Sequence, residues 1–407
     1  MVYPYQFTDF VWDLYELSYF EKYVDVCVLD LSAIINPRHS PSNKKESLKH
    51  DNVRRLTSLY QFYKYIETLP MNNKVCILDN IKYSSFKEVV CGLIMYVQLK
   101  KYKNIKIFDL YNGGVPIYRD DVNSLNAIWK FLLFSKNLAN IQDMWKGFKR
   151  FFFKSLSVNI SKMHTHYLAA GTEWLNLSQA YNLNHKTLVF GHSYDYSKFL
   201  QSRKNVRPSL VAGKKYAVFL ADAGPFSGDD AYLGFRSCDV WFPSLVQFFD
   251  TLERETGVVV KIAGHYKSNY LPTEPLFGNR NVYYNQTLDL VKNCEYSITI
   301  QSTAISMSVA FEKPVICIFS NELKNEKITM RNINGLTSRL GISPINIDEN
   351  FISDNFSDFL HVDLDQYSKY KSGVLTSSSS NEPNYKIILR DIMGVNTDQN
   401  KNKLNIL

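Results

Sequence analysis

The sequence predicts a two-domain α/β protein in which each domain contains a doubly wound parallel sheet. Short apolar runs of strand length alternate with amphipathic stretches of helix length in both halves of the chain, a rhythm typical of parallel sheets covered by helices. The length of 407 residues also favours two domains, because single cores rarely grow beyond about 250 residues. A polar segment at 203–213, which contains Pro208 and Gly213, separates the two series and is the expected linker.

The first series occupies the N-terminal half. Its expected strands, which are rich in Val, Ile and Leu, are 26–29, 75–78, 105–110 and 187–190. Its expected helices, in which apolar residues recur at helical spacing, are 53–66 and 86–99.

The second series has the same rhythm. Its expected strands are 216–220, 258–262, 297–300 and 315–319, and its expected helices are 243–255 and 304–311. Pro243 suits the first turn of a helix and Gly257 suits its end. A further helix at 385–393 is expected to pack back across both domains. The expected organisation is therefore a first domain at 1–205, a second at 206–375, and a crossing helix with a flexible tail at 376–407.

Cysteine usage and the N-terminus indicate a cytoplasmic protein. The six cysteines show no spacing typical of a metal site, and we expect them to be reduced, buried thiols. Residues 1–14 lack the basic start and apolar core of a secretory signal. No apolar run reaches the length of a membrane-spanning helix.

The net charge of +8 favours anionic partners. The basic residues are spread along the chain without a nucleic-acid-binding motif, so a nucleic-acid partner is not expected. Lys146, Lys149 and Arg150 stand before three consecutive phenylalanines, a pattern that suits a peripheral contact with a membrane, or a helix with one buried face.

Two loops of the second half follow predicted strands and carry polar side chains suited to ligands. Ligands of doubly wound sheets bind at the carboxyl ends of the strands, where helix N-termini offer free N–H groups. The candidate binding residues of these loops are His265, Lys267, Ser268, Gln301, Ser302 and Thr303. The alternative is that Ser302 and Thr303 only cap a helix and that 262–270 is an ordinary polar loop.

Carboxylates supply the candidate chemistry. Asp229 and Asp230 lie on a glycine-flanked loop after strand 216–220 and could act as nucleophile or base, or form a solvated turn. In the first half, Glu173 is a candidate general base, or a surface residue. His192 and Asp195 follow strand 187–190 and are further candidate residues for binding the donor. No metal site is expected, because no His or Cys cluster has metal-ligand spacing.

The second half resembles the nucleotide-binding half of GT-B glycosyltransferases. The resemblance rests on "AGHYKSNY", on the helix start at Thr287 to Val291, and on "ITIQSTAISMSVAFEKPVICI". With "GHSYDY" of the first half it is most similar to bacterial retaining β-Kdo transferases, which use CMP-Kdo, and it covers roughly residues 160–325. It implies a GT-B fold, with two Rossmann-like domains facing a central cleft.

The resemblance also implies roles for individual residues. His265, Lys267, Ser302 and Thr303 would hold the CMP phosphate, while Gln301 and Thr287 would line the donor site. Asp229 or Asp230 would face the anomeric carbon, and Glu173 would serve the acceptor. Many relatives carry a "PxHxD" loop where this chain has Pro225 to Asp229, and this match favours Asp229.

The function implied is transfer of Kdo from CMP-Kdo to a hydroxyl of a surface glycan such as O-antigen or capsule. The acceptor would be lipid-linked, the enzyme would work without metal or cofactor, and its location would be the cytoplasm or the inner face of the inner membrane. Three alternatives remain open. They are a transferase of another CMP- or UDP-activated sugar, a sugar-nucleotide epimerase, and a catalytically silent glycan-binding subunit.

Overall fold

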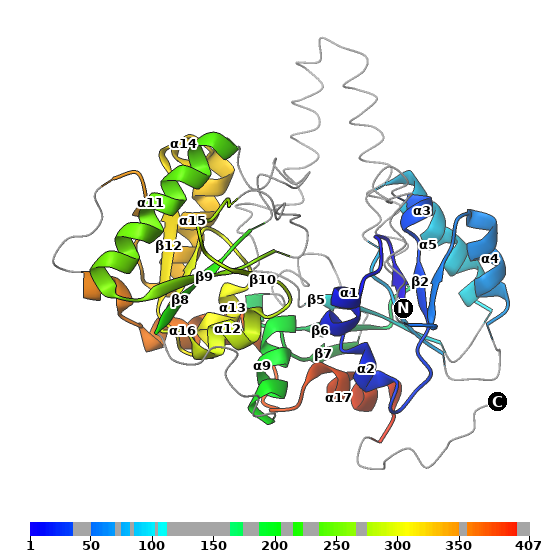
Figure 1. Cartoon of the computed structure of the whole chain (residues 1–407). Helices are drawn as coiled ribbons and strands as arrows, with labels where there is room; N and C mark the ends of the chain where they lie inside the picture. Colours follow the sequence, from blue (N-terminus) through cyan, green and yellow to red (C-terminus); the bar gives the residue numbers. More distant parts are fainter. Residues whose placement is uncertain are drawn as a thin grey trace, which may run out of the picture.

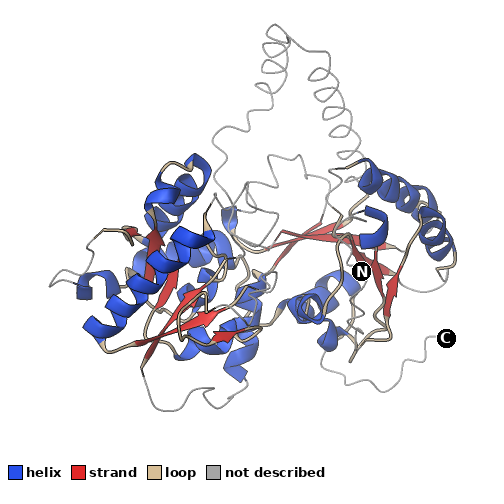
Figure 2. Ribbon diagram, turned by 45° about the horizontal axis from the view of Figure 1, so that its top comes forward, coloured by secondary structure: helices blue, strands red, loops and turns tan. Residues whose placement is uncertain are grey.

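The computed structural model describes residues 1–35, 50–69, 75–81, 85–101, 105–111, 163–173, 187–204, 215–222, 236–265, 275–349 and 356–396. Within these residues the chain forms two α/β lobes (Figure 1). Strands β1 to β7 belong to the first lobe and strands β8 to β13 to the second, and both lobes have helices packed on their sheets (Figure 2).

The second lobe contains a six-stranded parallel sheet. Its strands are β8 (Tyr216–Leu220), β9 (Val259–Ala263), β10 (Val282–Tyr283), β11 (Ser297–Thr299), β12 (Val315–Phe319) and β13 (Ile345–Asn346). The spatial order is β10-β9-β8-β11-β12-β13. Counted within the lobe this is the order 3-2-1-4-5-6 of a Rossmann-like sheet, and its direction reverses between β8 and β11.

The first lobe repeats this arrangement. Its strands are β1 (Val2–Tyr3), β2 (Val28–Asp30), β3 (Val53–Arg55), β4 (Cys76–Leu78), β5 (Lys106–Tyr111), β6 (His166–Ala169) and β7 (Thr187–Phe190). The two groups β1-β2-β3 and β4-β5-β6-β7 are joined by a parallel bridge between Val2 and Asp79. The resulting order, 3-2-1-4-5-6-7, reverses between β1 and β4. The predicted class, α/β with two Rossmann-like doubly wound domains of the GT-B type, is confirmed.

Helices of the first lobe are α1 (Asp9–Leu14), α2 (Leu17–Phe20), α3 (Ser32–Ile35), α4 (Leu59–Glu67), α5 (Phe86–Leu99) and α9 (Tyr194–Lys204). Local sequence sets the start of α5, because Ser85 and Glu88 form a reciprocal capping box. Ser58 caps α4, because its hydroxyl accepts a hydrogen bond from Gln61 N.

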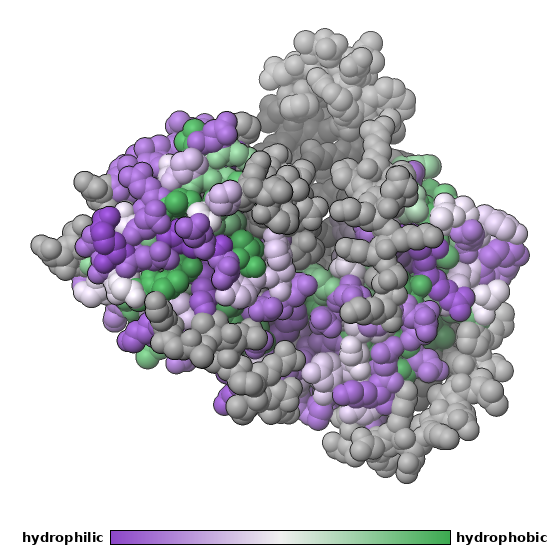
Figure 3. Space-filling model, in the orientation of Figure 1, coloured by the Kyte–Doolittle hydropathy of each residue, from purple (hydrophilic) through white to green (hydrophobic). Residues whose placement is uncertain are grey.

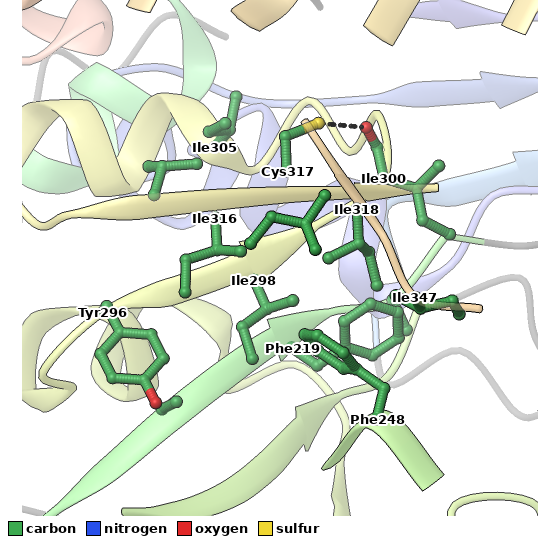
Figure 4. Packing of buried hydrophobic residues seen from close by; sticks show 14 of the residues in the cluster. Phe219, Phe248, Tyr296, Ile298, Ile300, Ile305, Ile316, Cys317, Ile318 and Ile347 are labelled. Carbon is green, nitrogen blue, oxygen red and sulfur yellow. Dashed lines mark hydrogen bonds between the residues drawn. The ribbon is translucent and has the colours of Figure 1, made fainter. Parts of the chain in front are cut away.

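Helices of the second lobe are α11 (Cys238–Thr256), α12 (Thr287–Asn293), α13 (Ile305–Ala310), α14 (Asn321–Lys324), α15 (Lys327–Leu340), η1 (Phe356–Leu360), α16 (Leu364–Tyr370) and η2 (Lys371–Leu375). Central strands β8, β11 and β12 bury side chains on both faces, which is why they read as continuous apolar runs. Phe219, Phe248, Ile298 and Ile316 belong to the resulting core (Figure 4).

After η2 the chain returns to the first lobe. Val374 and Leu375 are still part of the core of the second lobe. The last helical segment, α17 (Asn384–Ile387) with η3 (Ile388–Met393), packs instead in a cluster of the first lobe, and Tyr385 stacks on Tyr19 with ring centroids 4.8 Å apart. A helical segment is thus present near the expected position and packs on the first lobe, while its crossing of both domains stays a prediction.

Two predicted helices differ from the observed elements. Residues 53–55 form β3 instead of the start of a helix, because they pair with β2 and Arg55 Nε donates to the buried Asp30 carboxylate at 3.0 Å. Helix α11 begins at Cys238, so Pro243 lies inside it. An internal proline costs about 3 kcal/mol, which the burial of Trp241 and Phe242 offsets.

The thiols agree only in part with the expectation from composition. All six cysteines are free, and Cys91, Cys294 and Cys317 are buried, but Cys238 is exposed at the start of α11, contrary to prediction. Among the described residues, no group of three His, Cys, Asp or Glu side chains is arranged to hold a metal ion. No described helix combines the length and the hydropathy needed to cross a membrane.

Candidate functional site

The reversal of strand order in the second sheet defines the candidate site. Ligands of doubly wound sheets bind in the crevice outside the carboxyl ends of the two strands that flank the reversal. Here those strands are β8, which is followed by Asp222, and β11, which is followed by the loop 300–303. The predicted Asp229 and Asp230 belong to the connection between β8 and α11 and lie outside the described residues.

The neighbouring strands bring further predicted residues to the same edge. His265 follows β9, which pairs with β8, and Thr287 opens α12 directly after β10. A side chain at Gly264 would meet Val282 and Tyr284 at 2.7 Å, so only glycine lets the loop pass β10 this closely. Lys267 and Ser268, from the same loop as His265, lie outside the described residues.

The loop after β11 is held by its own hydrogen bonds. Ser302 N donates to Thr299 Oγ1 at 3.1 Å, and Asn332 Nδ2 of α15 donates to Gln301 Oε1 at 3.3 Å. Cys317 Sγ donates to Ile300 O at 3.1 Å and ties the loop to β12 (Figure 4). The amide nitrogen of Gln301 is buried and has no hydrogen-bond partner within the described part of the chain. Gln301 therefore retains an unused donor, whereas Thr303 is exposed.

A buried ion pair that the sequence did not reveal lies at the same edge. Arg236 Nη2 donates to Asp222 Oδ2 at 2.9 Å, and the guanidinium lies 5.1 Å from the centroid of the Trp241 ring. Its other two nitrogens, Nε and Nη1, have no partner among the residues described here. Ser237 N donates to Glu322 Oε1 at 3.3 Å, which links the start of α11 to helix α14 after β12. A single Arg among mainly apolar residues carries no sequence signal for such a pair.

Glu173 lies where the two lobes meet. It follows β6, and its Oε2 accepts a hydrogen bond from Arg339 Nη2 of α15 at 2.7 Å. The backbone is close here as well, because a Cβ atom on Gly171 would lie 2.1 Å from the carbonyl oxygen of Gly373. The carboxylate predicted to serve as a base is thus held by an arginine of the opposite lobe.

Asp195 belongs to the same junction. It lies in the first turn of α9, where burial raises its pKa to about 6 and the nearby Lys198 opposes the shift. Tyr370, at the end of α16, is close enough to Arg339, Asp195 and Glu173 to feel their charges, and burial raises the pKa of Tyr370 well above its usual value. Two predicted residues of the first domain, Glu173 and Asp195, are therefore brought to one region between the lobes.

His192 contacts the chain that returns to the first lobe. It is buried, and its Nδ1 and Nε2 lie 2.8 Å from Thr376 Oγ1 and 3.0 Å from Glu382 O. Burial lowers its pKa to about 4, so the ring is neutral at pH 7. Its backbone N–H donates to Asn384 Oδ1 at 2.9 Å. His192 thus anchors the returning chain, and its predicted contact with a ligand stays a prediction.

A cavity of about 500 Å³ lies in the first lobe. Its lining is mostly apolar and comes from strands β2, β4 and β5, from the segment around α2 and from the returning helix, including Val26, Val75 and Ile388. None of the predicted site residues lines it, although Asn384, which accepts a hydrogen bond from His192 N, does. The candidate site is placed by topology at the carboxyl edges of the sheets.

No protein-family model matches the sequence, and no curated protein sequence matches it. Solved structures do match it. A variant of the wall teichoic acid polymerase TagF is 13% identical over 97% of this chain and 88% of its own, with a TM-score of 0.48. MurG of Acinetobacter baumannii is 8% identical over 96% and 97%, with a TM-score of 0.42.

A third match is a putative UDP-N-acetylglucosamine 2-epimerase from Listeria monocytogenes, which is 8% identical over 94% of this chain and 92% of its own, with a TM-score of 0.44. Identities and TM-scores this low do not identify the activity of the present chain. Its strand order, and not these similarities, locates the candidate site.

Proposed function

We propose that the chain is a glycosyltransferase that binds a nucleotide-activated sugar at the carboxyl edge of the second sheet. The observation that carries this proposal is the reversal between β8 and β11, which gathers His265, Thr287 and the loop 300–303 at one edge. The sequence resemblance to GT-B enzymes implies that these residues bind the donor sugar nucleotide. The domain limits proposed for such an enzyme are 1–205 and 206–375, with 376–407 returning to the first domain.

We propose CMP-Kdo as the donor, on the sequence resemblance. A monophosphate leaving group needs positive charge and hydrogen-bond donors when the glycosidic bond breaks. Lys267, a protonated His265 and the hydroxyls of Ser302 and Thr303 would supply them. The amide nitrogen of Gln301, which has no partner among the described residues, offers another donor at this edge.

The proposed chemistry is transfer with retention, to a lipid-linked glycan. Asp229 would attack or shield the anomeric carbon from the face opposite the phosphate. Glu173 would accept the proton that the acceptor hydroxyl loses as the new bond forms. Arg339 binds Glu173 Oε2, and no hydrogen bond to Oε1 is found among the described residues, so Oε1 is the atom proposed to receive the proton.

A nucleotide panel tests the donor site directly. Thermal shift and calorimetry would compare CMP, CDP, UMP, UDP and GDP, because a ligand that binds the folded state raises the melting temperature. We expect CMP to stabilise the protein selectively and His265→Ala to weaken that effect. His361→Ala, an exposed histidine of the same lobe outside the proposed site, is the control.

The other outcomes separate the alternatives. Selective stabilisation by UDP would indicate a UDP-activated donor instead of a CMP-activated one. Turnover of a sugar nucleotide without an acceptor would indicate an epimerase. No response to any nucleotide would contradict the proposal and favour a glycan-binding subunit. In that case replacing Glu173, Asp229 and Asp230 together would leave the biological activity intact.

A further inference from the structure

Helix α5 exposes a hydrophobic face on the outside of the first lobe. Its exposed fractions are 65% for Phe86, 39% for Leu93, 42% for Tyr96 and 58% for Val97. At 100° per residue, Phe86, Leu93 and Val97 lie within about 40° of one another around the helix axis. The opposite side of α5 faces the core through Cys91, Met95 and Leu99, and the buried Val89 lies between the two sides.

The charged side chains on this face are all positive. Lys87, Lys100 and Lys101 are exposed on α5 or directly after it. The one acidic residue of the helix, Glu88, is buried and accepts a hydrogen bond from Ser85 N at 2.8 Å. Lys100 Nζ lies 6.0 Å from the centroid of the Tyr96 ring. We call the seven exposed side chains the α5 face: Phe86, Lys87, Leu93, Tyr96, Val97, Lys100 and Lys101.

This combination indicates a specific kind of partner. The surface seen in Figure 3 is mainly hydrophilic, with smaller hydrophobic areas. Scattered exposed hydrophobic residues are ordinary, but several on one helix face mark an interaction surface. Apolar and aromatic side chains bordered by lysines are complementary to an anionic lipid bilayer, where the rings and aliphatic groups enter the headgroup boundary and the ammonium groups meet lipid phosphates.

We propose that the α5 face docks the first lobe onto an anionic membrane surface. The helix has 14 residues, about 21 Å, which is too short to span a bilayer, so it would lie in the interface. Helices α4 and α5 lie side by side on the outer side of the lobe (Figures 1 and 2). Because α5 follows β4, Phe86 lies toward the carboxyl edge of the first sheet and would hold that edge near the bilayer.

Co-sedimentation with vesicles tests this proposal independently of any sugar nucleotide. We expect the full chain to sediment with phosphatidylcholine vesicles that contain phosphatidylglycerol, to sediment less with phosphatidylcholine alone, and to dissociate as salt rises. The double variant Phe86→Ser with Val97→Ser should bind these vesicles at least about tenfold more weakly than the wild type. Lys100→Glu with Lys101→Glu should abolish the preference for the anionic lipid.

A matched control is available on the second lobe. Val240 and Ile328 are 49% and 48% exposed, and replacing both by Ser removes similar hydrophobic area elsewhere. We expect this control to bind vesicles like the wild type, and both double variants to keep their melting temperature. Equal loss of binding in the Val240 and Ile328 control and in Phe86→Ser with Val97→Ser, or no binding by the wild type, would overturn the proposal. So would a wild-type dimer that becomes monomeric on replacement of Phe86 and Val97, since the face would then bind a second copy.

Discussion

Asp222 and Arg236 form a buried ion pair, 2.9 Å long, that closes the two ends of the connection between β8 and α11. Asp222 lies just after β8 and Arg236 just before α11, so the pair fixes the base of the segment that contains Asp229 and Asp230. Closing this segment costs conformational entropy, which the pair and the contact of Arg236 with Trp241 offset.

Breaking this pair on one side should destabilise the protein strongly. Arg236→Gln removes the guanidinium from beside the buried Asp222 carboxylate, and the expected loss is about 3–5 kcal/mol of unfolding free energy. Asp222→Asn with Arg236→Gln removes both charges and should recover much of that loss. Urea unfolding of the two single variants and the double variant measures the coupling. A double variant no more stable than Arg236→Gln would show that the ion pair is not what stabilises this site.

The pair of Glu173 and Arg339 should matter for activity more than for stability. Both side chains are partly exposed, so the pair itself is worth about 0–1 kcal/mol. If Glu173 is the general base, Glu173→Gln should lower kcat by about 10²–10⁴-fold with little change in melting temperature. Arg339→Met is the matched control, since it removes the same ion pair but keeps the carboxylate. Equal losses of kcat in both variants would assign Glu173 a positioning role instead.

Glu16 should make stability depend on pH. Burial raises its pKa from 4.5 to about 7, although Ser197 and the Tyr385 N–H donate hydrogen bonds to it. Between about pH 4.5 and 7 the folded state therefore holds a proton that the unfolded state has released. The contribution of Glu16 to the free energy of unfolding is full below about pH 4.5 and is lost as the pH rises to about 7. The shift of about 2.5 pH units corresponds to roughly 3 kcal/mol.

Glu16→Gln isolates this effect. Its stability relative to the wild type should increase by about that amount between pH 4.5 and 7.5, measured by urea unfolding at each pH. Glutamine also keeps a side chain at a position whose backbone is left-handed, with φ of 58°. The comparison with the wild type removes the contribution of other buried groups that titrate in this range, such as Asp195. Parallel curves for the two proteins would refute the assignment to Glu16.

Gly171 should tolerate no side chain. A Cβ atom there would lie 2.1 Å from Gly373 O and 2.6 Å from Val374 N, both backbone atoms, so Gly171→Ala must push the lobes apart or distort η2. We expect a loss of several kcal/mol or a protein that is cleaved more rapidly by proteases at the junction. Gly335→Ala in α15 is the control, because no atom lies within 4 Å of the added methyl group. It should stabilise the protein by about 0.5–1 kcal/mol, as measured by thermal unfolding.

The sequence by itself determined the fold class and many elements. Strands 187–190, 216–220 and 315–319 and helix 86–99 are observed with the predicted bounds. They were readable because buried parallel strands are short continuous apolar runs and because helix caps are local signals. The carboxyl-end loops that contain His265 and Gln301 could likewise be found from the strands that precede them.

Only the tertiary structure decided which of these segments meet. Strand order, the pairing of 53–55 with β2, and the use of His192 to hold the returning chain depend on contacts between distant residues. The same is true of Asp222 with Arg236 and of Glu173 with Arg339, which are 14 and 166 positions apart. Such ion pairs leave no periodicity or local motif in a sequence, because packing of whole helices and sheets brings the charges together.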